Sequence, residues 1–110
     1  MYKEATIHVP VLYNTGKTIE QSKHAQFEEE ILNNLSNGFS ISQVSGVWRN
    51  DKGKIYREEM NRYTIAVKYD TIEKQYESHR RLKELARFAK KQYDQEAIYI
   101  INPNGQVEFI

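Results

Sequence analysis

Three side chains, His8, Glu58 and Arg62, could carry out acid–base chemistry if the fold brought them together. An imidazole exchanges protons near neutral pH, and a carboxylate and a guanidinium could complete a polar cluster with it. However, the sequence has no spacing typical of a nucleophile, a base and a group that orients the base. A single histidine among polar strand residues is more often a plain surface residue. An enzyme of unknown reaction that uses His8 with Glu58 or Arg62 is therefore the third of three hypotheses, and we assign no catalytic residue.

The sequence gives little indication of a metal or a cofactor. Its three histidines fall in three separate predicted elements without HxxxH or HExxH spacing, and there is no cysteine. The triplet GKT at residues 16–18 lacks the earlier glycine of a phosphate-binding loop, so we interpret it as a loop glycine followed by a helix cap. We expect neither a metal nor a cofactor.

The only tryptophan lies in the stretch GVWRNDKGKIY, residues 46–56. Tryptophan, tyrosine and arginine are enriched at protein interfaces and at their energetic hot spots, and a large mixed aromatic patch usually marks a contact surface. Strand alternation places several such residues on one sheet face. The candidate ligand or interface residues are Trp48, Arg49, Tyr56, Glu58, Arg62, Tyr99 and His8. The leading hypothesis is a non-enzymatic interaction or ligand-binding domain. It would self-associate through this open sheet face as a homodimer, or bind a protein partner there.

A basic stripe on the second predicted helix supports an alternative hypothesis, nucleic-acid binding. Such a stripe can neutralise phosphates, and its affinity for nucleic acid would fall with salt. Charged helix faces are nevertheless usually solvated surface, and Arg80 and Glu84 have the spacing of an ordinary i,i+4 ion pair. The possible nucleic-acid contacts are Arg80, Lys83, Arg87, Lys90 and Lys91.

The elements that must position these residues follow from hydrophobic periodicity. Alternation predicts a strand over residues 4–13, and Thr18 followed by Gln21 has the capping-box spacing that predicts a helix start. That helix should end at Asn37-Gly38. Two strands are expected at 39–49 and 55–69, joined by a polar turn at 50–54. Thr71 should cap a second helix that runs to about Tyr93, and the chain should end in a small hairpin over residues 97–110.

This order predicts an α+β domain with a ferredoxin-like β-α-β-β-α-β arrangement, two helices on one face of an antiparallel sheet, and an additional C-terminal hairpin strand. A second interpretation keeps the same elements and pairs the open sheet face with a second copy, as in dimeric barrels. Alternation alone does not distinguish the two.

Composition sets the remaining limits. A chain of 110 residues fits one domain, residues 1–110, and the absence of cysteine excludes disulfides and thiol catalysis. A net charge of +1 provides no strong overall field toward nucleic acid or an anionic membrane. No apolar run approaches the roughly 20 residues of a membrane helix, and the N-terminus lacks the pattern of a signal peptide. We expect a cytoplasmic protein with no membrane contact.

The run GVWRNDKGKIYREEMNRYTIAV, followed by a charged helix and YDQEAIYI, resembles a group of small uncharacterised bacterial α+β proteins with the pattern GxWR(D/N)xxGxxYxE. The matching positions are Gly46, Trp48, Arg49, Gly53, Tyr56 and Glu58, with Asn50 at the variable position. The resemblance implies a free-standing domain and assigns no activity and no catalytic residue.

Overall fold

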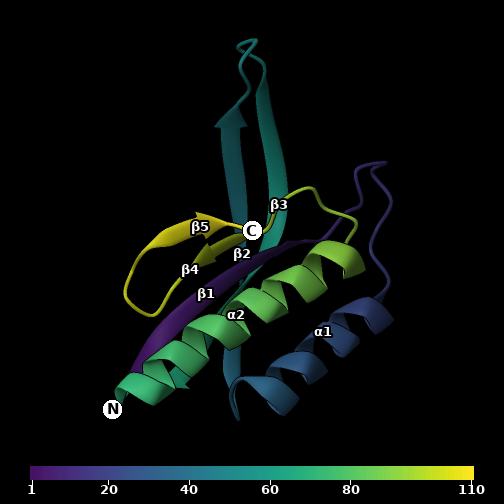
Figure 1. Cartoon of the computed structure of the whole chain (residues 1–110). Helices are drawn as coiled ribbons and strands as arrows, with labels where there is room; N and C mark the ends of the chain where they lie inside the picture. Colours follow the sequence, from purple (N-terminus) through teal and green to yellow (C-terminus); the bar gives the residue numbers. More distant parts are fainter.

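The computed structural model describes all 110 residues. Along the chain the elements are β1 (Tyr2–Pro10), α1 (Gln21–Asn34), β2 (Phe39–Arg49), β3 (Ile55–Lys68), α2 (Ile72–Gln92), β4 (Tyr99–Ile101) and β5 (Val107–Phe109). The five strands form one sheet in the order β2-β3-β1-β4-β5, and all neighbouring strands are antiparallel. Both helices lie side by side on one face of this sheet (Figure 1). The predicted α+β class, with an antiparallel sheet and two helices, is confirmed.

Strand alternation divides each central strand between the two faces of the sheet. Ala5, Ile7 and Val9 of β1 are fully buried, whereas His8 between them is only partly buried. Across the helix side of the sheet, Phe27 of α1 contacts the ring of Tyr63 edge-on with ring centres 5.0 Å apart. Burying a side chain of this kind contributes roughly 1.5–3 kcal/mol. The hydrophobic core therefore lies between the helices and the sheet.

The start of α1 differs from the prediction, because Thr18 does not cap the helix. Thr18 instead forms an isolated antiparallel bridge with Leu12, and the Ile19 N–H donates to the Val11 carbonyl at 3.1 Å. This pairing buries Ile19 and gives its N–H a backbone partner outside the helix. The helix begins at Gln21 after Glu20, whose carboxylate accepts a hydrogen bond from the Tyr13 hydroxyl.

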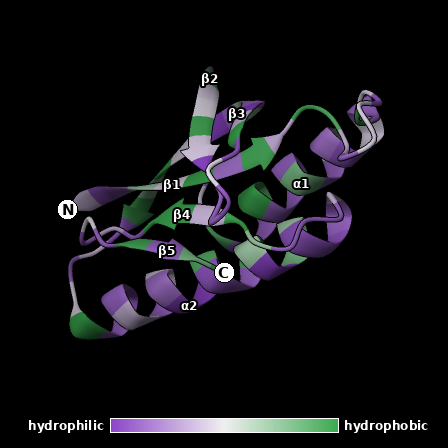
Figure 2. Cartoon of the chain, turned by 90° about the horizontal axis from the view of Figure 1, so that it is seen from above, coloured by the Kyte–Doolittle hydropathy of each residue, from purple (hydrophilic) through white to green (hydrophobic).

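The start of α2 agrees with the prediction. The Thr71 hydroxyl oxygen accepts a hydrogen bond from the Lys74 N–H at 3.2 Å, which is the contact expected of a threonine N-cap. The helix then buries Leu82, Leu85 and Ala86 against the sheet. In the cartoon of Figure 2 most residues of α2 have the colour of hydrophilic residues, and hydrophobic residues are visible in β1 and β4. Neither α1 nor α2 is long and apolar enough to span a membrane.

The β2–β3 hairpin extends beyond the rest of the sheet (Figure 1). The pairing of β1 with β3 ends at Pro10 and Met60, whereas β2 and β3 remain paired as far as Arg49 and Ile55. The predicted turn is confirmed: Asn50 Oδ1 accepts hydrogen bonds from the N–H groups of Lys52 and Lys54. The outer part of the hairpin is thus a two-stranded ribbon without a third strand beside it.

Candidate functional site

A cavity of about 720 Å³ lies where the hairpin leaves the sheet, and we call it the sheet-face cavity. All five strands and the loop before β4 contribute to its walls. The strand residues that alternate away from the helices supply most of the lining: His8, Pro10, Val44, Gly46, Trp48, Glu58, Met60, Tyr99 and Phe109. Its walls therefore combine aromatic rings with the titratable side chains of His8, Glu58 and, from the loop before β4, Glu96.

A row of rings crosses one side of this cavity. The ring centres of His8 and Tyr99 are 4.8 Å apart, and those of Tyr99 and Phe109 are 5.4 Å apart. Tyr99 and Phe109 are directly paired residues of β4 and β5, so strand register fixes this row. Ring separations of 4.5–7 Å are those at which aromatic side chains stabilise one another.

His8 is the most unusual group of the cavity. Its Nε2 atom is buried and has no hydrogen-bond partner in the protein. Burial, and secondarily the positive charge of Arg62, lower the pKa of His8 below its usual value. The imidazole is therefore largely neutral at pH 7, and a neutral imidazole can accept a proton. An unsatisfied buried nitrogen costs free energy, so it is a group from which a functional role is expected.

Glu58 lines the same cavity from β3. Burial raises the pKa of its carboxyl above the usual value. Gly46 is its direct partner on β2, and a Cβ at Gly46 would lie 2.5 Å from the Met60 methyl carbon. The missing side chain of Gly46 therefore leaves the space that Met60 occupies beside Glu58.

Trp48 and Tyr56 form the outer aromatic pair of the hairpin. Their rings are stacked, with centres 5.9 Å apart and an angle of 16° between the planes. Only Trp48 of the two lines the cavity, and 45% of its surface remains exposed. The stacked Tyr56 ring thus supports the Trp48 indole at the rim of the cavity.

The structure brings together four of the seven sequence candidates for ligand or interface residues. His8, Glu58, Trp48 and Tyr99 line the cavity, whereas Arg49, Tyr56 and Arg62 do not. Arg49 pairs with Ile55 and alternates to the other side of the hairpin. Arg62 is exposed and is the strand partner of His8, so its influence on the cavity is electrostatic.

Sequence reasoning missed Phe109 and the residues that precede β4. Gln95 and Glu96 join the cavity lining because the loop after α2 returns across its edge. Phe109 had a usable signal, since residues that flank a tight turn pair in register and Tyr99 was already a candidate. The loop residues had no such signal.

The predicted basic stripe of α2 is partly neutralised by acidic neighbours. Arg80 pairs with Glu84 at 2.8 Å, and Lys83 approaches Glu108 of β5 at 3.7 Å. Arg87, Lys90 and Lys91 form no ion pair with a carboxylate. Nucleic-acid contact through these five residues stays a prediction.

The other two histidines are packing residues. His24 Nδ1 lies 2.9 Å from the buried Tyr93 hydroxyl, and His79 Nε2 lies 2.8 Å from the Tyr69 hydroxyl. No group of three or more histidine, cysteine, aspartate or glutamate side chains is arranged to hold a metal ion.

Two solved structures share this fold. A phage SAM lyase in complex with S-methyl-5'-thioadenosine superposes with a TM-score of 0.72 at 16% sequence identity, covering 99% of this chain and 88% of the lyase chain. The apo state of a phage SAM lyase gives a TM-score of 0.68 at 15% identity, with coverage of 99% and 87%. No curated protein matches the sequence.

These structures correct the leading functional hypothesis. The same arrangement of strands and helices serves an enzyme in both of them, which contradicts the expectation of a non-enzymatic domain. Self-association through the open sheet face as a homodimer, or binding of a protein partner there, stays a prediction. Of the aromatic residues that were candidates for a ligand or interface site, Trp48 and Tyr99 line a cavity.

A family model described as "Protein of unknown function (DUF3574)" matches residues 11–109. The match agrees with the resemblance to small proteins of no assigned activity, and the more specific GxWR(D/N)xxGxxYxE pattern stays a prediction. The chain belongs to the DUF3574 family.

Proposed function

We propose that the protein is an enzyme whose active site is the sheet-face cavity and whose substrate is a small organic cation with a planar ring. The observation that carries the proposal is the buried, unpartnered Nε2 of His8 in a cavity that also holds Glu58. A base with a lowered pKa and a carboxyl with a raised pKa in one cavity form a common acid–base arrangement.

The lining favours a cation with an aromatic part. Trp48, Tyr99 and Phe109 present rings on which a planar group can stack, and the face of an indole attracts positive charge. A cation beside Glu58 would favour the ionised carboxylate and so offset the effect of burial on its pKa. The substrate would therefore supply the charge partner that Glu58 lacks within the protein.

SAM is the first substrate to test, because the chain shares its fold with a SAM lyase and because a SAM sulfonium carries both an adenine ring and a positive charge. In a lyase reaction the electron pair of a C–S bond goes to sulfur and leaves a neutral thioether. The alkyl fragment loses a proton, which neutral His8 can accept as a general base, and the electron pair of that C–H bond forms a C=C bond in the fragment. Loss of the sulfonium charge in the product would weaken its attraction to Glu58.

The experiment measures thioether release by chromatography and ligand binding by the fluorescence of Trp48, the only tryptophan. We expect SAM to change the fluorescence and to be converted to S-methyl-5'-thioadenosine. His8→Gln should lower kcat by on the order of a hundredfold, the usual contribution of one acid–base group.

Glu58→Gln should weaken SAM binding. The matched control is Glu59→Gln, because this variant removes the same charge from the neighbouring position, on the opposite side of β3. Absence of both a fluorescence change and product would refute SAM as the substrate. Equal effects of the Glu58 and Glu59 variants would refute the assignment of the cavity.

We also propose that the fold is a ferredoxin-like one with β5 added at its edge. The chain order β1-α1-β2-β3-α2-β4 and the strand order β2-β3-β1-β4 support this assignment.

A further inference from the structure

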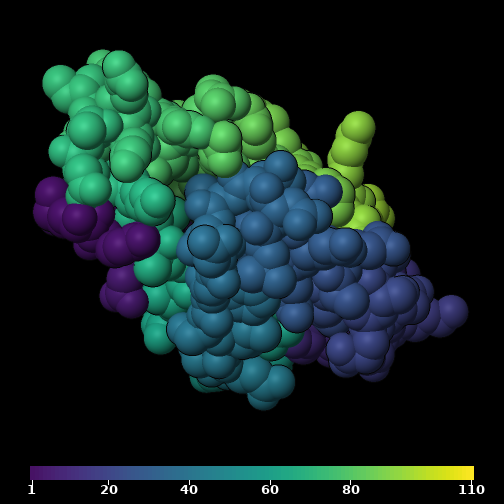
Figure 3. All heavy atoms as spheres, turned by 90° about the horizontal axis from the view of Figure 1, so that it is seen from below, coloured from purple at the N-terminus to yellow at the C-terminus, as the bar shows by residue number.

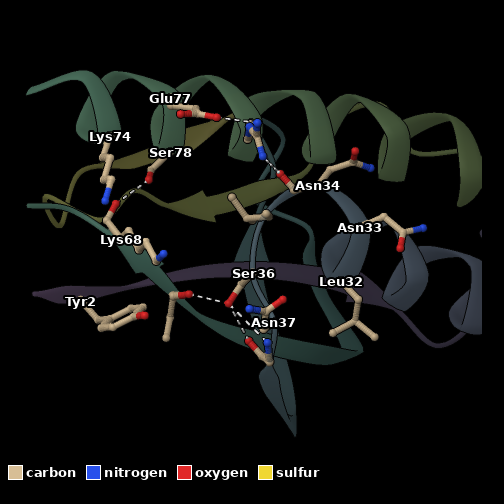
Figure 4. A pocket seen from close by; sticks show the side chains of 14 residues that line it. Tyr2, Leu32, Asn33, Asn34, Ser36, Asn37, Lys68, Lys74, Glu77 and Ser78 are labelled. Atoms are coloured by element: carbon tan, nitrogen blue, oxygen red, sulfur yellow. Dashed lines mark hydrogen bonds and ion pairs between the residues drawn. The ribbon is translucent and has the colours of Figure 1, made fainter. Parts of the chain in front are cut away.

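A second cavity, of about 530 Å³, lies where α1 ends and α2 begins, and we call it the helix-end cavity. Its walls come from the end of α1 and the turn after it, the first turns of α2, and the outer ends of β1 and β3 (Figure 4). Seen from below, the N-terminus, the end of α1 and the start of α2 lie at this end of the molecule (Figure 3). It shares no lining residue with the sheet-face cavity.

The walls of the helix-end cavity are held by hydrogen bonds to backbone carbonyls. The Ser36 hydroxyl donates to the Ala66 carbonyl at 2.6 Å, and the Ser78 hydroxyl donates to the Lys68 carbonyl at 2.9 Å. Both contacts attach neighbouring elements to the part of β3 that extends past the start of β2. These two hydrogen bonds hold the turn after α1 and the first turns of α2 in place relative to β3, and so define the backbone walls of the cavity.

The charge of this cavity is positive. Glu77 is the only carboxylate in its lining, and it already forms an ion pair with Arg81, which also donates to the Asn34 carbonyl at 2.6 Å. Lys68 and Lys74 form no ion pair with any carboxylate. The carboxylate of Asp70 lies near both of them: its pKa is lowered first by the N-terminal ammonium group, with which it pairs, and further by Lys74 and Lys68. The two ammonium groups are therefore not held in an ion pair of their own.

Neutral donors and apolar surface complete the lining. The side-chain amides of Asn33 and Asn37 form no hydrogen bond within the protein. Tyr2 and Leu32 line the cavity with 62% and 47% of their surface exposed. Figure 4 shows Tyr2 near Lys68 and Asn37 near Ser36. An anion with a ring would fit both the ammonium groups and this apolar surface.

We propose that the helix-end cavity binds a small organic anion, a ring compound that carries a carboxylate or a phosphate group. Lys68 and Lys74 contact the anionic group, the Asn37 amide donates a hydrogen bond to it, and the ring lies against Tyr2, since Figure 4 places Asn33 and Leu32 on the opposite side of the cavity from Tyr2 and the two lysines. This proposal does not depend on the proposed enzyme activity, because it concerns different residues at a different place.

The test is an NMR titration of the ¹⁵N-labelled full chain at constant ionic strength. The three probes are benzoate, phenyl phosphate and inorganic phosphate, so that the carboxylate, the phosphate ester and the bare anion are distinguished. We expect saturable shifts of the amides in residues 33–38 and 66–78 for at least one ring compound, with weaker binding of inorganic phosphate.

The variant Lys68→Gln/Lys74→Gln should raise the Kd by about tenfold, because it removes both ammonium groups. The matched control Arg87→Gln/Lys91→Gln removes the same charge from α2 outside the cavity and should leave the Kd unchanged. A second variant, Asn37→Asp, keeps the side-chain shape and should weaken binding by charge repulsion.

Three results would overturn the proposal. The first is the absence of saturable shifts with any probe. The second is a pattern of shifts that spreads over the whole basic face of α2, and the third is an equal loss of binding in the control variant. Either of the last two would identify a general attraction to positive charge.

Discussion

Adjacent residues of β1 face two very different environments. Ile7 is fully buried beneath the helices, whereas His8 lies in the sheet-face cavity with a buried nitrogen that nothing in the protein satisfies. The helix side resembles the interior of any stable domain, with close contacts among apolar side chains. The open side keeps polar groups partly buried without partners, which costs stability. The difference shows that the two faces of one sheet meet different requirements: the helix face stabilises the fold, whereas the open face leaves polar groups without partners in a cavity.

The largest expected effect is on stability and separates the two faces directly. Ile7→Ala should lower the free energy of unfolding by about 2–5 kcal/mol, the usual cost of truncating a buried isoleucine. His8→Ala should change it by less than about 1 kcal/mol, because it also removes an unsatisfied buried nitrogen. Urea denaturation of both variants measures the difference. A larger loss for His8→Ala than for Ile7→Ala would contradict this division of the sheet.

A smaller effect is expected from two tyrosine hydroxyls. Tyr93 is fully buried, and its hydroxyl lies 2.9 Å from His24 Nδ1 on the helix side. Tyr93→Phe should cost about 1–3 kcal/mol, because it leaves a buried imidazole nitrogen without its partner. Tyr99→Phe on the open side should be nearly neutral, because the Tyr99 hydroxyl forms no hydrogen bond. Thermal denaturation of both variants measures the two effects. Equal losses would show that the cavity rim contributes to stability as the core does.

The smallest effect concerns pH. Burial lowers the pKa of His8 in the folded state, so below its unfolded value of about 6.5 the unfolded chain binds more protons. His8 therefore contributes its full share to the free energy of unfolding above about pH 6.5. This contribution is lost as the pH falls from the unfolded pKa to the lower pKa of the folded state. Glu58 acts in the opposite direction, because its raised pKa makes its contribution fall as the pH rises above about 4.5.

Arg62→Gln tests the cause of the His8 shift. Removing the guanidinium should raise the His8 pKa, measured by NMR titration of the ring protons, but leave it below the usual value because burial is the larger cause. An unchanged His8 pKa would show that Arg62 is too well screened by solvent to matter.

The sequence predicted the features that depend on local pattern. Alternation identified the buried face of β1, and Thr71 marked the start of α2, because a hydroxyl before an amphipathic helix has one strongly preferred use. Thr18 shows the limit of that argument. Its capping-box spacing was real, but burial of Ile19 through the bridge to Leu12 determined the backbone there.

Neither cavity could be derived from pattern. Trp48 and Tyr99 belong to residue types that both protein interfaces and ligand sites use, so their presence on one face did not distinguish the two. The cavity arises because the hairpin leaves the sheet beside Gly46 and because β5 brings Phe109 to the other side. Lys68 and Lys74 lie on different elements and have no shared spacing, so only the fold places both in the helix-end cavity.

The free end of the β2–β3 hairpin has a consequence for the size of the sheet-face cavity. Between Met60 and the turn, β2 and β3 have no third strand beside them, and an isolated pair of strands is only marginally stable in water. Trp48 belongs to this ribbon. The cavity therefore has a rigid side, which we call the firm wall, in the middle of the sheet, and a more flexible side, the compliant wall, on the hairpin. A bound molecule can draw the compliant wall toward itself at little cost in folding free energy. We therefore expect the width of the cavity to adjust to its occupant, and ligand binding to slow hydrogen exchange in residues 46–58 more than anywhere else in the sheet.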